Sequence, residues 1–138
     1  GGAAGVGFGV SGFDLLASGF VGKGLGSFFL LDFDGFDPTG KARDSSGFLA
    51  QGTDTFGTTK LGLSYGQNAL QETDADKAAR QGGGAAGVET RSSITGGVYH
   101  DINKSLKAVV EYTHATTKWH GGADQSVDVV AVGGFFLW

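Results

Sequence analysis

Charged and hydrogen-bonding side chains recur along this 138-residue chain at spacings that place them on one side of an extended backbone. In the stretch LKAVVEYTHA, Lys107 and Glu111 lie four residues apart, so both point to the same face of a strand. The two charges either contribute to a transverse field or neutralise each other through their neighbours. Such a face can act on hydrated solutes without any covalent step. The candidates for it are Gln51, Thr53, Lys60, Arg91, Asp101, Lys107 and Glu111.

Other kinds of chemistry find little support in the residue pattern. The chain has no cysteine, so it can form neither disulfides nor thiolate metal sites. His114 and His120, with Asp124 nearby, are more simply explained as solvated histidines at the base of a loop than as metal ligands. The stretch DFDGFD at 32–37 lacks the full spacing and the later glutamate of an EF-hand loop.

Nucleotide binding and catalysis are also disfavoured. The glycine pairs of GVGFGV and GKGLG are not followed by the strand, glycine loop and helix that hold a dinucleotide. No Ser–His–Asp or paired-carboxylate arrangement occurs at a recognisable spacing. We therefore expect no enzyme, no bound metal and no cofactor.

The composition is unusual for a small soluble domain. Charged residues make up 17% of the chain, where about a quarter is usual. There are 27 glycines without a collagen-like G-x-y period, and they lie among Val, Leu, Phe and Tyr. The net charge is -4 and the basic residues are scattered, which argues against a nucleic-acid partner. No stretch approaches the roughly 18 apolar residues of a spanning helix.

Period-two alternation predicts that the chain is built from strands. In the stretch SLKAVVEYTHATTKW, Leu106, Ala108, Val110 and Tyr112 share one apolar face. The alternation runs over more than ten residues, whereas globular strands average about five or six residues and transmembrane strands about 9–11. Seven strands are predicted, at about 3–10, 13–23, 48–56, 60–68, 91–102, 105–118 and 126–138.

The connections between the predicted strands alternate between short and long. Tight turns are predicted at 11–12, 57–59 and 103–104, and longer links at 25–47, 68–90 and 120–125. In an up-and-down sheet all tight turns then lie at one end, as in outer-membrane barrels. Within the second long link, QETDADKAAR forms either a short helix or irregular coil.

Three ordered stretches, SGFDLLASGFVGKGLG, TKLGLSYGQNAL and ITGGVYHDINKSLKAVVEYTHA, resemble the C-terminal half of Gram-negative trimeric general porins. The resemblance covers almost the whole chain, although each motif alone is weak. It implies an all-β, antiparallel, up-and-down transmembrane barrel in the bacterial outer membrane. It also implies a homotrimer, contact with membrane lipid and lipopolysaccharide, and passive diffusion of small hydrophilic solutes and ions through a water-filled channel.

The terminal aromatic residue of that family corresponds to Trp138, where phenylalanine is more usual. With Trp138 towards lipid, Phe136 also faces outward, while Phe135 and Leu137 face inward, where the family commonly carries basic or polar residues. Aromatic residues gather at the water–lipid interfaces of such barrels. The predicted girdle residues are Tyr65, Tyr112, Phe136 and Trp138, whereas for Trp119 a role at a loop base competes with a place in the girdle.

Seven up-and-down strands leave the two ends of the chain on opposite sides, whereas single-chain bacterial barrels have even strand numbers. We therefore expect residues 1–138 to be the C-terminal part of one barrel domain of about 16 strands. One alternative is a complete small barrel whose eighth strand lies within 27–36, non-conducting and with a structural or anchoring role. Another is a secreted glycine-rich β-sheet protein that forms extracellular layers or fibres.

Overall fold

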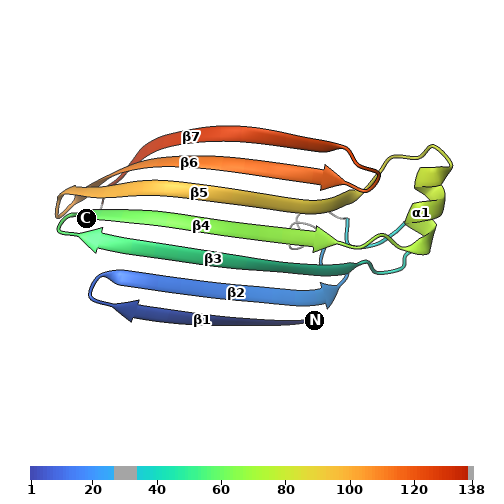
Figure 1. Ribbon diagram of the computed structural model, residues 1–138, viewed down its shortest axis with the longest axis horizontal. Helices are drawn as coiled ribbons and strands as arrows, with labels where there is room; N and C mark the ends of the chain where they lie inside the picture. The colour runs from blue at the N-terminus through green and yellow to red at the C-terminus, as the bar shows by residue number, and fades with distance from the viewer. Residues whose placement is uncertain (27–33, 137–138) are drawn as a thin grey trace.

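The protein is described by a computed structural model, which covers residues 1–26 and 34–136. These residues form one sheet of seven antiparallel strands, in which neighbours in the chain are neighbours in the sheet (Figure 1). The elements are β1 (Gly2–Val10), β2 (Phe13–Lys23), β3 (Asp44–Phe56), β4 (Thr59–Leu70), α1 (Asp74–Gln81), β5 (Val88–Asn103), β6 (Leu106–Trp119) and β7 (Asp124–Phe136).

All seven predicted strands are therefore confirmed, as is the all-β, up-and-down class. The largest difference is at β3, which begins at Asp44 rather than at 48. The stretch DSSG carries no apolar alternation, so periodicity could not detect it. Its backbone nevertheless continues the pairing with β2, from Gly47 opposite Phe20 to Asp44 opposite Lys23. A salt bridge of 3.0 Å between Lys23 Nζ and Asp44 Oδ1 lies at this end.

The tight turns all lie at one end of the sheet, and the long connections with α1 lie at the other (Figure 1). We call these the turn end and the loop end. Ser11 and Gly12 both have positive φ, 49° and 89°, as a two-residue hairpin turn requires. Gly57 has φ 59° in the second turn. In the third turn, the Asn103 side chain accepts a hydrogen bond of 2.9 Å from the Ser105 backbone.

The hairpins are staggered at the turn end. Phe13 lies opposite Asp54, so β3 runs two residues farther, to Phe56, before it turns. Thr59 lies opposite His100, and β5 then continues for three more residues. Each successive hairpin therefore extends farther beyond the turn end than the hairpin before it.

The stretch for which helix and coil were both open forms α1. Thr73 caps the helix, and its hydroxyl accepts from the backbone of Asp76 while the Asp76 carboxylate accepts from the backbone of Thr73. This reciprocal capping box satisfies two donors at the helix start, and Asp76 stands in the position that Glu or Gln usually occupies. Among the described residues, no helix is long and apolar enough to cross a membrane.

Burial is concentrated at the loop end of the sheet and in the connections there. Leu70 and Ser45, at the loop-end limits of β4 and β3, are buried together with Thr73 and Asp37, whereas Val109 is buried farther along the sheet. Strands β1 and β7 are exposed along their whole length. Across the described residues, each of these two strands is paired on one side only, so the sheet is open.

The alternative eighth strand falls mainly on residues 27–33, which lie outside the described part of the chain. Phe36, at the end of that predicted segment, forms an isolated bridge with Ala42.

Candidate functional site

The register divides the sheet into two faces, because directly opposed residues in an antiparallel pair lie on the same side. Thr53 lies opposite Gly62, which lies opposite Gly97, which in turn lies opposite Glu111. With the alternation along each strand, this row places every predicted candidate on one side, which we call the polar face: Gln51, Thr53, Lys60, Arg91, Asp101, Lys107 and Glu111.

Part of the polar face forms a hollow of about 490 Å³ over β2 to β6. Five of the seven predicted residues line it: Gln51, Thr53, Lys60, Lys107 and Glu111. The other two do not. Arg91 lies nearer the loop end, in register with Asn68 and Thr117, and Asp101 lies at the turn end opposite Lys107.

Charges in and beside this hollow are partly paired. Lys107 Nζ lies 3.3 Å from Asp101 Oδ1. The Tyr99 hydroxyl donates a hydrogen bond to Glu111. The hydroxyls of Thr95 and Thr113 lie 2.8 Å apart and extend the polar surface towards the loop end. The lining is thus a set of fixed hydrogen-bonding groups rather than a reactive constellation.

The polar character does not extend to the edge strands. On β1 the same face carries Gly5, Gly7 and Gly9, and on β7 it carries Val127 and Val129. Phe135 also lies on this face, opposite Lys107, as the outward assignment of Phe136 predicts. Leu137 lies outside the described residues.

The opposite side, which we call the apolar face, exposes a band of large hydrophobic side chains. Val6 is 70% exposed, Leu63 is 58% exposed and Val132 is 79% exposed. Asp54 interrupts the band one row from the turn end, between Phe13 and Leu61. The band includes Val6, Phe8, Leu15, Phe48, Leu61, Leu63, Tyr65, Ile94, Val98, Val110, Tyr112, Val130, Val132 and Phe136.

The border of this band towards the loop end runs obliquely across the strands. The first polar residue beyond the band is Lys23 on β2, Ser46 on β3, Gln67 on β4, Ser92 on β5, His114 on β6 and Asp128 on β7. The strand pairing shows how far the border moves across the sheet. Asp128 on β7 lies level with Ala17 on β2, as the successive pairings of His114, Ile94, Tyr65 and Ala50 show. On β2 the border is instead at Lys23, six residues closer to the loop end, so it shifts by six residues over five strand-to-strand steps.

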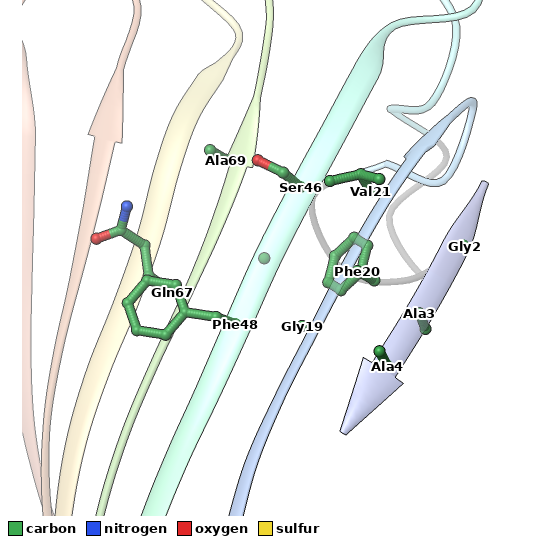
Figure 2. Close-up of a pocket in the computed structure, with 11 residues that line it drawn as sticks. Gly2, Ala3, Ala4, Gly19, Phe20, Val21, Ser46, Phe48, Gln67 and Ala69 are labelled. Carbon is green, nitrogen blue, oxygen red and sulfur yellow. The ribbon is translucent and has the colours of Figure 1, made fainter. Parts of the chain in front are cut away.

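The apolar face over β1 to β3 illustrates this shift. There the apolar zone reaches almost to the loop end, and small residues including Gly2, Ala4 and Gly19 leave a shallow hollow of about 580 Å³. Val21 and Phe48 lie at the hollow, with Gln67 beyond Phe48 (Figure 2). At the corresponding level on β6 and β7, the face carries Thr116 and Ser126 instead, with their hydroxyls 3.0 Å apart.

Aromatic residues mark both borders of the band. Towards the loop end lie Phe48, Tyr65 and Tyr112, and towards the turn end lie Phe13, Phe56 and Phe136. The Tyr65 hydroxyl donates to Gln67 at 3.1 Å, and the Tyr112 hydroxyl donates to Asp128 at 2.6 Å. Each tyrosine thus directs its polar end away from the apolar band. The fourth predicted girdle residue, Trp138, lies outside the described residues.

A separate polar cluster joins the connections at the loop end, and we call it the loop cluster: Asp37, Arg43, Glu72, Thr73, Asp76, Arg80 and His120. Arg43 donates two bonds to Asp76, of 2.7 and 2.6 Å, and also bonds to the carbonyls of Asp34 and Phe36. Arg80 likewise makes a two-point contact with Glu72.

These contacts perturb the carboxylates of the loop cluster. The Arg43 guanidinium lowers the pKa of Asp76 to about 2. Hydrogen bonds from Thr39 and Thr73 hold the pKa of Asp37 well below its usual range. The hydrogen bond from Arg80 lowers the pKa of Glu72. All three groups therefore remain ionised at neutral pH, and the cluster is held by charge-assisted bonds.

Two histidines considered above as metal ligands make other contacts. The Nδ1 atom of His114 lies 2.7 Å from Asp128 on the apolar face. His120 belongs to the loop cluster, where its Nε2 atom donates to the Leu70 carbonyl at 2.9 Å. Trp119 lies at the base of the last connection, which is the second of the two places considered for it, and its backbone N–H donates to the carbonyl of Ala123.

Sequence reasoning did not select Asp14 or Tyr99, which both line the polar hollow. A signal for Tyr99 was present, because Val98 was assigned to the apolar side and its neighbour must then point the other way. Gly62 and Gly97 leave room for the Tyr99 ring, since a side chain at either position would meet it. Phe48 and Phe56 were also missed. They lie eight residues apart on one face of a strand whose alternation is noisy.

The two faces therefore offer different chemistry to their surroundings: one presents hydrogen-bonding groups and charges, and the other presents hydrocarbon and rings. A scan against protein-family models, a search of curated proteins and a search of solved structures each found no match for the chain.

Proposed function

We propose that this protein is a porin of the bacterial outer membrane. Its seven strands form part of a transmembrane β-barrel, and small hydrophilic solutes and ions diffuse passively along the polar face. The observation that carries the proposal is the oblique apolar band on the opposite face. The band's orientation, height and borders each support it.

The obliqueness of the band matches the strand tilt of a barrel. A membrane plane that cuts tilted strands meets each one at a shifted position. A shift of six residues over five steps, at about 3.3 Å per residue and about 4.8 Å between strands, corresponds to a tilt of about 40°. Membrane barrels have strands tilted by about 35–45°. The hairpins step in the same direction, so the turns would also lie level beneath the membrane.

The height of the band is close to that of a bilayer core. On β3 it extends from Phe48 to Phe56, which is about 26 Å along a strand and about 20 Å along the membrane normal at this tilt. Barrels of this class have an apolar band about 25 Å tall between two aromatic girdles. The tyrosines whose hydroxyls point away from the band suit the girdle on the loop side.

An apolar face of this size also needs a non-aqueous environment. In a soluble sheet it would be covered by a second layer. In the described part of the chain no such layer covers it, and its valines and leucines remain exposed. Lipid provides the cover that the fold lacks.

Barrel closure follows from the same environment. In lipid, the unpaired backbone groups of β1 and β7 would each cost several kcal/mol. These two strands run in the same direction, so antiparallel pairing throughout requires an odd number of additional strands between them. A barrel of about 16 strands, the size that encloses an aqueous channel, would add about nine.

The remaining parts of the proposal derive from the resemblance to general porins. They are assembly as a homotrimer and contact with outer-membrane lipid and lipopolysaccharide. The polar face then serves as the wall of the channel, where its charged and hydroxyl side chains set the local potential and the free width.

Reconstitution tests the proposal. Purified protein added to a planar bilayer is expected to give stepwise increases in conductance, and membrane-bound protein is expected to resist carbonate extraction. Resistance to extraction without conductance would favour the small closed barrel with an anchoring role. Complete release by carbonate would contradict membrane integration and favour an extracellular sheet protein.

A further inference from the structure

We propose that the hollow of the polar face is a weak binding site for short zwitterionic peptides, with Asp14 and Lys60 as its two charged ends. The inference rests on the proposed porin function and names a solute class for that wall. Two observations support it: Asp14 and Lys60 have no partners among the described residues, and their spacing suits a short peptide.

Four charged side chains line the hollow, and two of them are already engaged. Lys107 is paired with Asp101, and Glu111 accepts the hydrogen bond of Tyr99. The other two are Asp14 and Lys60. Among the described residues, neither of these two side chains has an ion-pair or hydrogen-bond partner, and their charges are opposite. A solute in the hollow therefore meets Asp14 and Lys60 as a carboxylate and an ammonium group whose hydrogen-bonding capacity is free, while the Glu111 carboxylate keeps its charge but is already hydrogen-bonded to Tyr99.

The two groups are too far apart to neutralise each other directly. Asp14 lies opposite Thr53 on β3, whereas Lys60 on β4 lies opposite Thr55. Two strand spacings and two residues separate their Cα atoms by about 12 Å. The Asp14 carboxylate also lies over Gly9, where a side chain would collide with it, so it leans towards β1 and away from Lys60.

The surface between the two charges suits a peptide backbone. Gln51, Thr53, Ser64 and Thr95 line the same hollow and provide neutral donors and acceptors. A dipeptide can present its ammonium group to Asp14, its carboxylate to Lys60 and its amide to these side chains. A sugar of similar size can hydrogen-bond to all of these groups, but because it is neutral it gains no charge–charge attraction at either end. A simple ion can use one charge but not both.

The experiment measures uptake into proteoliposomes at low ionic strength. Diglycine and xylose, which are similar in size, are supplied at low concentration, and the ratio of their initial rates is recorded. We expect the protein to favour diglycine by about threefold to fivefold, the effect of one weak exposed ion pair. Lys60→Gln and Asp14→Asn are each expected to reduce the ratio to about that of a neutral wall. The double variant is expected to lower the ratio little further, because a zwitterion gains little attraction when only one of its two charges has a partner.

Lys118→Gln is the matched control, since it removes the same charge from the opposite face near the loop end. It is expected to leave the ratio unchanged. All variants are first checked for stepwise conductance. Conducting channels whose ratio is near one, or is insensitive to both substitutions, would overturn the peptide site while leaving the porin proposal intact. Absence of conductance in the unmodified protein would instead contradict the porin proposal itself.

Discussion

The sheet and the loop end of this molecule follow different packing rules. In the sheet, large hydrophobic side chains such as Val132 and Leu63 are exposed. At the loop end, charged side chains are withdrawn from solvent and paired, as in the contact of Arg43 with Asp76, whose side chains are 16% and 12% exposed. The loop end thus orders its polar groups through partly buried pairs, whereas the apolar face of the sheet leaves its hydrophobic side chains uncovered. The proposed placement of the sheet in lipid, with the loop end in water, accounts for both regions.

The strongest test of this contrast places a charge at neighbouring positions on the two faces. Leu63→Lys would put an ammonium group within the apolar band, and we expect a loss of about 2–4 kcal/mol in the free energy of unfolding in lipid vesicles. Ser64→Lys, on the polar face, is expected to cost less than about 1 kcal/mol. Urea titration of vesicle-inserted protein measures both. Equal costs at the two positions would contradict the assignment of Leu63 to lipid.

At the loop end, removal of a charge should be the damaging change. Asp76→Ala removes the partner of Arg43 and the capping contact of α1, and we expect a local loss of about 2 kcal/mol. Hydrogen exchange of the α1 amides measures it. Asp74→Ala, in the first turn of the same helix, removes an acidic side chain that has no ion-pair or hydrogen-bond partner among the described residues, and is expected to cost less. Unchanged protection in Asp76→Ala would show that the ion pair is not what holds the helix.

The pH dependence of the two regions should also differ. The pKa of Asp76 is about 2 in the folded protein against an ordinary value of 3.8, and the pKa of Glu72 is also lowered. A lowered pKa contributes stability that is complete above the ordinary value and is lost as the pH falls through the folded value. We therefore expect α1 protection to decline between about pH 4 and pH 2. The β4–β5 amides within the apolar band serve as the internal reference and should stay protected.

The smallest expected effect concerns the border between the two regions. Tyr112→Phe removes the hydroxyl that bonds to Asp128, and we expect a loss of about 1 kcal/mol in lipid. Tyr65→Phe removes a longer bond to Gln67, and its cost should be smaller. Urea titration in vesicles compares them. A stabilising effect of Tyr112→Phe would indicate that the hydroxyl lies within hydrocarbon rather than at its edge.

Much of the sheet could be predicted because alternation acts locally. The residues of β6 display their two faces without reference to any other strand, so its limits were predicted within one residue. The beginning of β3 was missed because Asp44 and the two serines after it are polar on both sides. Whether 74–81 is helical could not be decided either, because the capping contact of Thr73 and the pairing of Asp76 with Arg43 depend on folding.

The sequence by itself determined which side chains share a face, since the backbone geometry of a strand fixes that alternation over every second residue. It also determined the seven strands and the ends at which their connections lie. Only the tertiary structure decided the register between strands, because the side-chain pattern repeats every two residues and is compatible with several offsets. The oblique band, the polar hollow and the pairing of Arg43 with Asp76 all depend on that register or on the packing of distant loops. They could therefore be seen only once the strands were placed side by side.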